Sequence, residues 1–287
     1  MKSIKELYRI GTGPSSSHTM GPRKAAEIFL ERHPEATAFK VTLYGSLAAT
    51  GKGHMTNIAI TEVLQPIAPV EIIWEPKIFL PFHPNGMKFV SVDKEGKETD
   101  QWVVFSIGGG ALAEESDGAS SVNTPDVYSM NSMTEILQWC ERTGKSYWEY
   151  VKECEDSDIW DYLQEVWKTM QNAVKRGLEQ EGVLPGPLNL RRKASTYYIR
   201  ASGYKQSLQS RGLVFAYALA VSEENASGGV IVTAPTCGSC GVMPAVLYHL
   251  AKSREFSDTR ILRALATAGL VGNIVKTNAS ISGAEVG

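Results

Sequence analysis

Residues 158–182 read DIWDYLQEVWKTMQNAVKRGLEQEG, and this stretch decides the class of fold. Its apolar residues recur at spacings of three and four, which is the spacing of one helix face. They are Ile159, Leu163, Val166, Met170, Ala173 and Val174. Residues 181–187, EGVLPGP, supply turn residues that end the pattern. The stretch therefore predicts a long amphipathic helix.

Further helical patterns lie on both sides of this stretch. They cover residues 132–144, 146–155, 211–226, 242–252 and 258–277. The last three are rich in Ala, Gly and Leu, so we expect buried helices of a helical core. Residues 228–235, GGVIVTAP, are β-branched and predict a strand between them.

The first half of the chain mixes helices and strands. Strands are predicted at residues 38–45, 70–76, 86–93 and 101–110. A helix follows the serine run and stops at Pro34, and another begins near Thr56. The polar residues 114–126 predict a linker. We expect an α+β fold. An N-terminal α/β domain occupies residues 1–150, with a helical linker from about 128, and a mostly α-helical domain occupies 151–287.

Length and composition indicate a globular protein. The chain has 287 residues, a formal net charge of −2 and 43% hydrophobic residues. Such a balance gives no basic face for nucleic acid. We see no secretory signal, and no apolar stretch reaches the ~18 residues that span a bilayer. We therefore expect a cytoplasmic protein without nucleic-acid or membrane partners.

Residues 11–22, GTGPSSSHTMGP, place hydroxyls and a histidine directly before a helix. Free N–H groups at a helix start and several hydroxyls suit a carboxylate. His18 could move a proton near neutral pH. The alternative is an ordinary capped helix start. Two more loops, YGSLAATGKGHMTN at 44–57 and HPNGM at 83–87, read as a flexible connector and a turn.

Residues 234–246, APTCGSCGVMPAV, hold Cys237 and Cys240 in a Cys-x-x-Cys spacing. A redox pair, half a zinc site and part of an iron–sulfur site all remain open on the residues alone. We expect Gly238 and Gly241 to let the backbone approach a bulky inorganic group. Because Cys240 precedes a helix, we expect a lowered thiol pKa. The other cysteines, Cys140 and Cys154, lie on predicted helices.

These motifs together resemble the bacterial iron–sulfur-dependent L-serine dehydratases in their single-chain form. The carriers are GPSSSHTMGP, LYGSLAATGKGH, FHPNGM, SIGGG, APTCGSCGVMPAV and KTNASISGAEVG, in that order. The resemblance implies an N-terminal β domain, like a regulatory amino-acid-binding module, and a helical α domain. It implies dehydration and deamination of L-serine to pyruvate and ammonia, in amino-acid degradation and gluconeogenesis.

The resemblance also implies site residues. A [4Fe–4S] cluster acts as Lewis acid, and Cys240 matches a cluster cysteine. Cys237 stands where many members have asparagine or a small residue. The remaining ligands are expected beyond residue 287, so we expect this chain, cut inside a domain, to be inactive. Ser16, Ser17 and Thr19 would hold the substrate carboxylate and His18 would transfer a proton. Lys276, Ser280 and Ser282 would approach from the α domain.

L-serine is the expected partner, and we expect a homo-oligomer. Two rival functions remain open. One is a pyridoxal-phosphate dehydratase, which needs a Schiff-base lysine and a phosphate-binding glycine loop. The other is a non-catalytic amino-acid-binding fragment.

Overall fold

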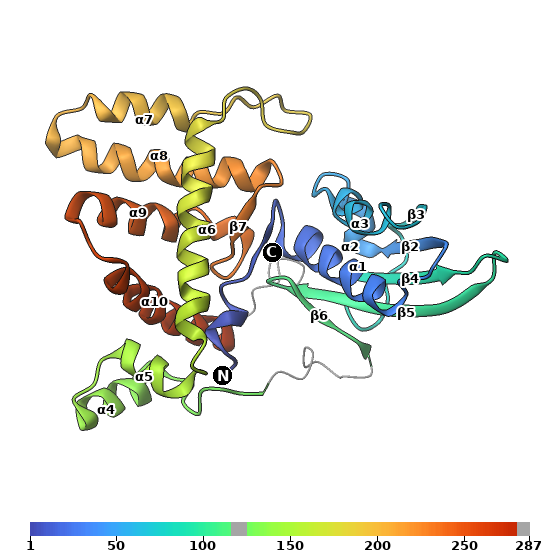
Figure 1. Cartoon of the computed structure of the whole chain (residues 1–287), viewed down its shortest axis with the longest axis horizontal. Coiled ribbons are helices and arrows are strands. Elements are labelled where there is room, and N and C mark those ends of the chain that lie inside the picture. The colour runs from blue at the N-terminus through green and yellow to red at the C-terminus, as the bar shows by residue number, and fades with distance from the viewer. Residues whose placement is uncertain (116–124, 280–287) are drawn as a thin grey trace. The chain divides into compact units, whose positions relative to one another are not determined.

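The computed structural model describes residues 1–115 and 125–279 (Figure 1). These residues fall into two compact units. The described residues between 14 and 124 form the α/β unit, and residues 1–13 with 125–279 form the helical unit. The predicted α+β fold is confirmed. The division differs from the boundary we expected at residue 150, because residues 125–150 pack with the helices that follow them.

The α/β unit is built on one sheet with the strand order β3-β2-β4-β5-β6. Its strands are β2 (Ala38–Tyr44), β3 (Val70–Glu75), β4 (Gly86–Val92), β5 (Glu98–Gly108) and β6 (Ala111–Ala113). Its helices are η2 (Ser16–Met20), α1 (Gly21–Arg32), α2 (Gly45–Thr50) and α3 (Thr56–Leu64). β2 and β3 are parallel, and all other neighbours in the sheet are antiparallel.

An aromatic cluster joins α1 to the sheet. Phe29 of α1 is fully buried, and its ring lies 5.5 Å from Phe89 and 6.1 Å from Phe39. Trp102 of β5 stacks nearly parallel to Phe29 at 6.3 Å. Burial of such rings dominates core energetics. The alternation that predicted β2 is the same one that turns Phe39, Val41 and Leu43 inward.

The helical unit is arranged around α6. Its helices are α4 (Met133–Thr143), α5 (Tyr147–Cys154), α6 (Ile159–Glu179), α7 (Ala194–Ser202), α8 (Gln206–Ala226), α9 (Val242–Arg254) and α10 (Asp258–Asn278). Short elements are η1 (Ile4–Glu6), β1 (Ile10–Thr12), β7 (Val230–Val232) and η4 (Cys237–Ser239). Figure 1 shows α7 to α10 stacked along α6, which contacts each of them.

The predicted amphipathic helix is confirmed as α6. All six apolar residues named above are buried on it, and Trp167 and Gly177 join the same face. The predicted strand at GGVIVTAP is confirmed as β7, which pairs with β1. Two helices were not predicted, α2 and α7. α2 has only six residues, and α7 buries only Ala194 and Ala201, so neither sequence shows apolar residues at a helical period.

The expectation of fully buried helices holds for only one face of each. α8, α9 and α10 bury small residues such as Ala216, Ala245 and Ala266. Their opposite faces leave large apolar side chains exposed, among them Phe215 at 52% and Val242 at 66%. No helix in the described part of the chain has the length and apolar character that crossing a membrane requires.

The N-terminal segment belongs to the helical unit. The carboxylate of Glu155 accepts hydrogen bonds from the Ile4 amide at 2.8 Å, the Ser3 hydroxyl at 2.7 Å and the Tyr128 hydroxyl at 2.7 Å. The Tyr8 hydroxyl donates to the Leu265 carbonyl at 3.0 Å. Ile4, Leu7 and Tyr8 are buried. These contacts explain why the first 13 residues do not join the domain that follows them in sequence.

Gly177 lets α6 and α8 approach closely. A Cβ at this position would lie 2.2 Å from the carbonyl oxygen of Ala220 and 2.8 Å from its Cα. Backbone atoms cannot rotate away as a side chain can. The two helices would therefore have to separate, which would open the core that α6 organises.

We predict that Gly177→Ala lowers the free energy of unfolding by about 2–3 kcal/mol, because overpacking outweighs the better helix propensity of alanine. Gly203→Ala is the matched control, since a Cβ there meets its nearest atom at 3.6 Å. Denaturant unfolding of both variants checks this. Equal midpoints for Gly177→Ala and the wild type would contradict it.

Candidate functional site

The serine turn, residues 15–20, opens the first helix of the α/β unit. The Ser15 hydroxyl caps it by accepting from the His18 amide at 3.1 Å. The Thr19 hydroxyl accepts from the Ser15 amide at 3.2 Å. η2 continues into α1 with Pro22 in its first turn. The turn is thus held by its own hydroxyls, while the Ser16 and Ser17 amides lie at the helix start, where intrahelical acceptors are lacking.

His18 is held between two hydroxyls. Its Nδ1 lies 2.9 Å from Ser17 Oγ and its Nε2 lies 3.1 Å from Ser46 Oγ. The side chain is 8% exposed. Burial, and then the nearby His54, lower the pKa of His18 to about 4, against a smaller opposing effect of Ser46. The imidazole is therefore neutral at pH 7.

His54 lies beside it, with ring centroids 4.7 Å apart. Its Nδ1 lies 3.1 Å from the Thr50 carbonyl oxygen. A carbonyl only accepts, so Nδ1 carries a hydrogen, and in the neutral ring the lone pair is on Nε2. Thr19 Oγ1 donates to the His54 carbonyl at 2.7 Å. Met55, the next residue, has a left-handed backbone with φ of 58°. The connector we expected here is instead α2 and an ordered turn.

Two more loops close around the same histidines. The Ser46 amide donates to the Pro84 carbonyl at 3.1 Å, and the Thr56 hydroxyl donates to the His18 carbonyl. Asn85 and Ser106 are fully buried, and Asn85 Nδ2 donates to the Ser106 carbonyl at 3.1 Å. Within the described residues, Asn85 Oδ1 and Ser106 Oγ have no hydrogen-bond partner. Buried polar atoms of this kind usually bind water or a ligand.

Sequence reasoning missed Ser46, Asn85 and Ser106, and it interpreted His54 as part of a connector. Ser46 and Asn85 could have been predicted from the glycines next to them in the sequence. Ser46 follows Gly45, whose backbone has a positive φ of 49°, and Asn85 precedes Gly86, which packs on Leu80. A polar residue beside a glycine that the backbone requires is a stronger candidate than a loop position alone.

The cysteine loop, residues 234–241, follows β7 in the helical unit. Ser239 Oγ donates to the Ala234 and Thr236 carbonyls at 3.0 and 3.1 Å, and the Cys240 amide donates to the Cys237 carbonyl at 3.2 Å. Cys237 and Cys240 are buried, and neither is in a disulfide. Burial raises the pKa of each to about 12. The expected low pKa of Cys240 is wrong, because loss of water around the thiol outweighs its position two residues before α9.

The two glycines of this loop differ. A Cβ at Gly238 would meet only Thr236 Oγ1, at 3.8 Å, so space is open there. A Cβ at Gly241 would lie 2.7 Å from the Ala218 carbonyl oxygen of α8, so this glycine serves helix packing. Within the described residues, no group of three His, Cys, Asp or Glu side chains could hold a metal. His249 Nε2 lies 2.7 Å from Ser210 Oγ.

Lys276 lies near the end of α10, also in the helical unit. Its Nζ donates to the Glu6 carbonyl at 2.8 Å. Burial, and then Arg9, lower the pKa of Lys276 to about 8, while Glu6 opposes the shift. Ser280 and Ser282, the other residues expected to approach from this part of the chain, lie outside the described residues. The structure thus gathers Ser16, Ser17, His18 and Thr19 in one unit, and it places Cys237, Cys240 and Lys276 in the other.

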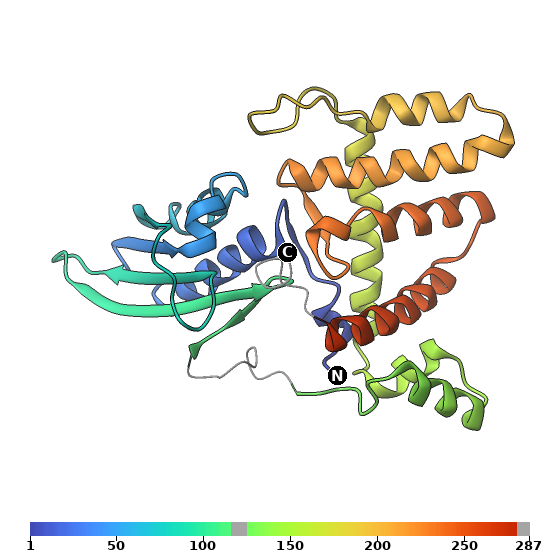
Figure 2. The same cartoon turned by 180° about the vertical axis from the view of Figure 1, so that it is seen from behind.

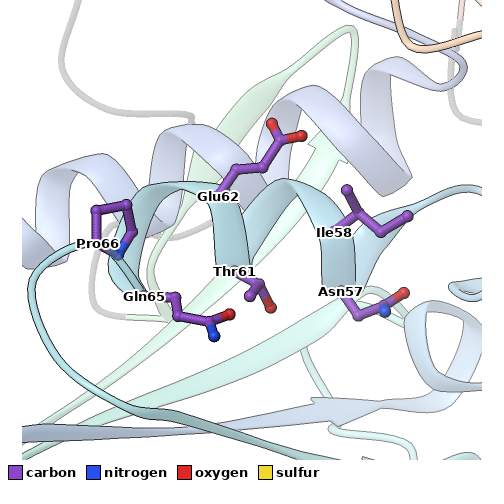
Figure 3. Close-up of a pocket in the computed structure, with 6 residues that line it drawn as sticks. All are labelled: Asn57, Ile58, Thr61, Glu62, Gln65 and Pro66. Carbon is purple, nitrogen blue, oxygen red and sulfur yellow. The ribbon is translucent and has the colours of Figure 1, made fainter.

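A separate groove of about 580 Å³ follows the outer face of α3 (Figure 3). Its lining residues are Asn57, Ile58, Thr61, Glu62, Gln65 and Pro66. Glu62 pairs with Arg23 of α1 at 2.8 Å. A single helix and the residue pair after it supply every wall, and none of these side chains is a histidine or cysteine. We assign no chemistry to this groove.

Two family models match the chain, and they meet between residues 73 and 84, inside the α/β unit. Residues 3–73 match the family model described as serine dehydratase beta chain, and residues 84–287 match that of serine dehydratase alpha chain. L-serine dehydratase 1 of Escherichia coli is 37% identical over the whole of this chain and 74% of its own length. L-serine dehydratases of Haemophilus influenzae and Streptomyces coelicolor are each 35% identical, over 100% and 99% of this chain and 74% of their own lengths.

These matches cover both units, and they join in one chain the two sequences that the family names as separate chains. The resemblance inferred from the motifs is thereby confirmed. The chain belongs to the bacterial L-serine dehydratase family.

Proposed function

We propose that this protein is a lyase that converts L-serine to pyruvate and ammonia. The names of its relatives support this substrate. The single observation that carries the proposal is the pairing of His18 and His54 beside the serine turn. Such a reaction needs a carboxylate holder, a proton acceptor near Cα and a way to help hydroxide leave.

The serine turn is the proposed carboxylate holder. The Ser16 and Ser17 amides lie at the positive end of a continuous helix, and their hydroxyls lie beside them. Ser106 Oγ adds a buried hydroxyl donor next to the turn, since it lies against Gly21. Asn85 Oδ1 is an acceptor and does not bond a carboxylate. A carboxylate bound here would also favour protonation of the neutral His18.

His54 is the proposed acceptor of the Cα proton. Its Nδ1–H is fixed on the Thr50 carbonyl, so Nε2 presents a lone pair. Both ring nitrogens of His18 contact hydroxyls, which suits a group that orients its neighbours or relays a proton. Removal of the Cα proton and loss of the β-hydroxyl as water leave aminoacrylate. Its tautomer hydrolyses to pyruvate and ammonia. We propose Lys276, whose pKa lies near 8, as a second proton-transfer group.

Cys240, and Cys237 beside it, are the proposed ligands of a [4Fe–4S] cluster. Soft thiols in a tight turn with open space at Gly238 fit such a group. When bound, a cluster with one iron free of cysteine supplies a Lewis acid for the leaving hydroxyl. Because both thiols have a pKa near 12, each must release a proton to become a ligand. Two thiols are fewer than the three or four needed, so we propose that the others lie outside residues 1–287. This chain alone would then be inactive.

We predict that His54→Gln lowers kcat by ~10²–10⁴-fold, the usual range for a general base. The assay follows pyruvate release by full-length protein reconstituted anaerobically with iron and sulfide. His33→Gln is the control, because His33 lies in the same unit but pairs with Asp100 away from the turn. His54→Gln with wild-type kcat and an unchanged pH profile would remove His54 from the mechanism.

We predict that acid weakens the fold through His18. Its pKa is about 4 when folded and 6.5 ordinarily, so the unfolded chain binds a proton between these values and the folded chain does not. The free energy of unfolding therefore falls as pH drops from 6.5 to 4, by at most about 3 kcal/mol, and this contribution is constant above 6.5. Denaturant titrations over this range should show a shallower slope for His18→Gln. Equal slopes would contradict burial of a neutral His18.

We predict that Cys240→Ser abolishes the broad visible absorbance of the reconstituted cluster and pyruvate release together. Cys140→Ser and Cys154→Ser are matched controls on separate helices and should keep both signals. Cys237→Ala tests the second thiol in the same assay. A cluster retained by Cys240→Ser, or formed by residues 1–287 alone, would overturn the ligand assignment. A yellow aldimine absorbance would instead indicate pyridoxal phosphate.

A further inference from the structure

The helical unit carries an aromatic groove remote in sequence from the motifs above. Three helices, α5, α6 and α10, supply its walls, and its volume is about 320 Å³. Its lining residues are Trp148, Lys152, Trp160, Thr259, Leu262 and Arg263. α5 packs on α10, and Figures 1 and 2 show both beside the first turns of α6.

Two tryptophans form the apolar part of this groove. The rings of Trp148 and Trp160 lie 6.1 Å apart at an angle of 68°. Edge-to-face packing of this kind fixes both rings. Both side chains are only half-buried, so indole surface remains open to the groove. Rigid aromatic surface of this kind stacks planar rings such as nucleobases.

Two cations border the aromatic surface. The Arg263 guanidinium lies 4.2 Å from the centre of the Trp148 ring. Stacking uses the face of a guanidinium and leaves the N–H donors in its plane available for a bidentate acceptor. Lys152 lines the groove from α5. Among the residues that the structure describes, neither cation makes a hydrogen bond or an ion pair.

The nearby acids already have donors. Hydrogen bonds from the Ser146 amide and hydroxyl lower the pKa of Glu149, and Lys145 and then Arg263 add smaller effects in the same direction. Asp258, which precedes Thr259, accepts from Trp167 Nε1 at 3.2 Å. Thr259 also lies in the first turn of α10, at the positive end of a 21-residue helix. The groove therefore favours negative charge.

We propose that this groove binds a small planar aromatic anion. The ring would stack on indole, and a carboxylate or phosphate would be held by Arg263 and Lys152. The volume is at the lower end of the range for small-molecule sites, ~300–1,000 Å³, which suits one ring system and one acidic group. The proposal is independent of the dehydratase chemistry, because it uses none of those residues.

Calorimetry on the full chain tests it with two ring-bearing anions, adenosine 5′-monophosphate and indole-3-acetate. Adenosine and inorganic phosphate, the two parts of adenosine 5′-monophosphate, are titrated separately. We expect saturable binding of at least one anion with a Kd below about 1 mM, and at least ~tenfold weaker binding of either part. The tighter of the two anions tells whether phosphate or carboxylate is preferred. No saturation by either anion up to about 10 mM would overturn the proposal.

Variants locate the binding. Arg263→Gln and Trp160→Leu should each raise Kd by at least ~tenfold. Arg260→Gln is the matched control, because Arg260 lies on the same helix and also stacks on an aromatic ring, Phe256, outside the groove. Circular dichroism checks the fold of each variant. If Trp160→Leu unfolds, Arg263→Gln alone tests the proposal, because Arg263 is exposed and its substitution should leave the fold intact. Unchanged binding by Arg263→Gln, or equal loss in Arg260→Gln, would overturn the proposal.

Discussion

The burial of the N-terminal segment is the constraint on which the helical unit depends. Glu155 accepts hydrogen bonds from Ser3, Ile4 and Tyr128, and this carboxylate fixes the segment before it reaches β1. β1 then pairs with β7, and β7 leads directly into the cysteine loop. The same segment offers the Glu6 carbonyl to Lys276. The surroundings of both groups proposed for chemistry in this unit are thus set by residues at the other end of the sequence, through hydrogen bonds that exclude water.

Much of the fold could be predicted because periodicity reports burial. The apolar residues of α6 recur at helical spacing over about four turns, and those of β2 alternate, so each pattern matches the face that is buried. α2 and α7 could not be predicted in this way, because α2 has six residues and α7 buries only Ala194 and Ala201. The N-terminal segment shows a different limit. Nothing local in Ile4 or Tyr8 indicates a partner more than 250 positions away; tertiary packing alone decides it.

The candidate site was predictable where one motif contains its own contacts. Ser15, Ser17, His18 and Thr19 bond within a single turn, so the motif and the geometry coincide. His54 and Ser46 reach the same place from a second loop, which a linear sequence does not reveal. The predicted low pKa of Cys240 was wrong for a related reason. The position of Cys240 before a helix can be read from the sequence, whereas its burial depends on tertiary packing, and burial has the larger effect on the pKa.

The sequence separation of these contacts also governs when the protein can become native. Lys2 and Asn273 are 271 positions apart, and Tyr8 and Leu265 are 257 apart. At ~5–20 residues per second, a ribosome needs about 13–50 s to make the intervening chain. During that time the Tyr8 hydroxyl lacks its partner Leu265 and the Lys2 carbonyl lacks Asn273, while the α/β unit between them can already fold from its own residues. Pairings of such high contact order are slow to form. The nascent N-terminus is therefore the segment that chaperones would have most time to engage.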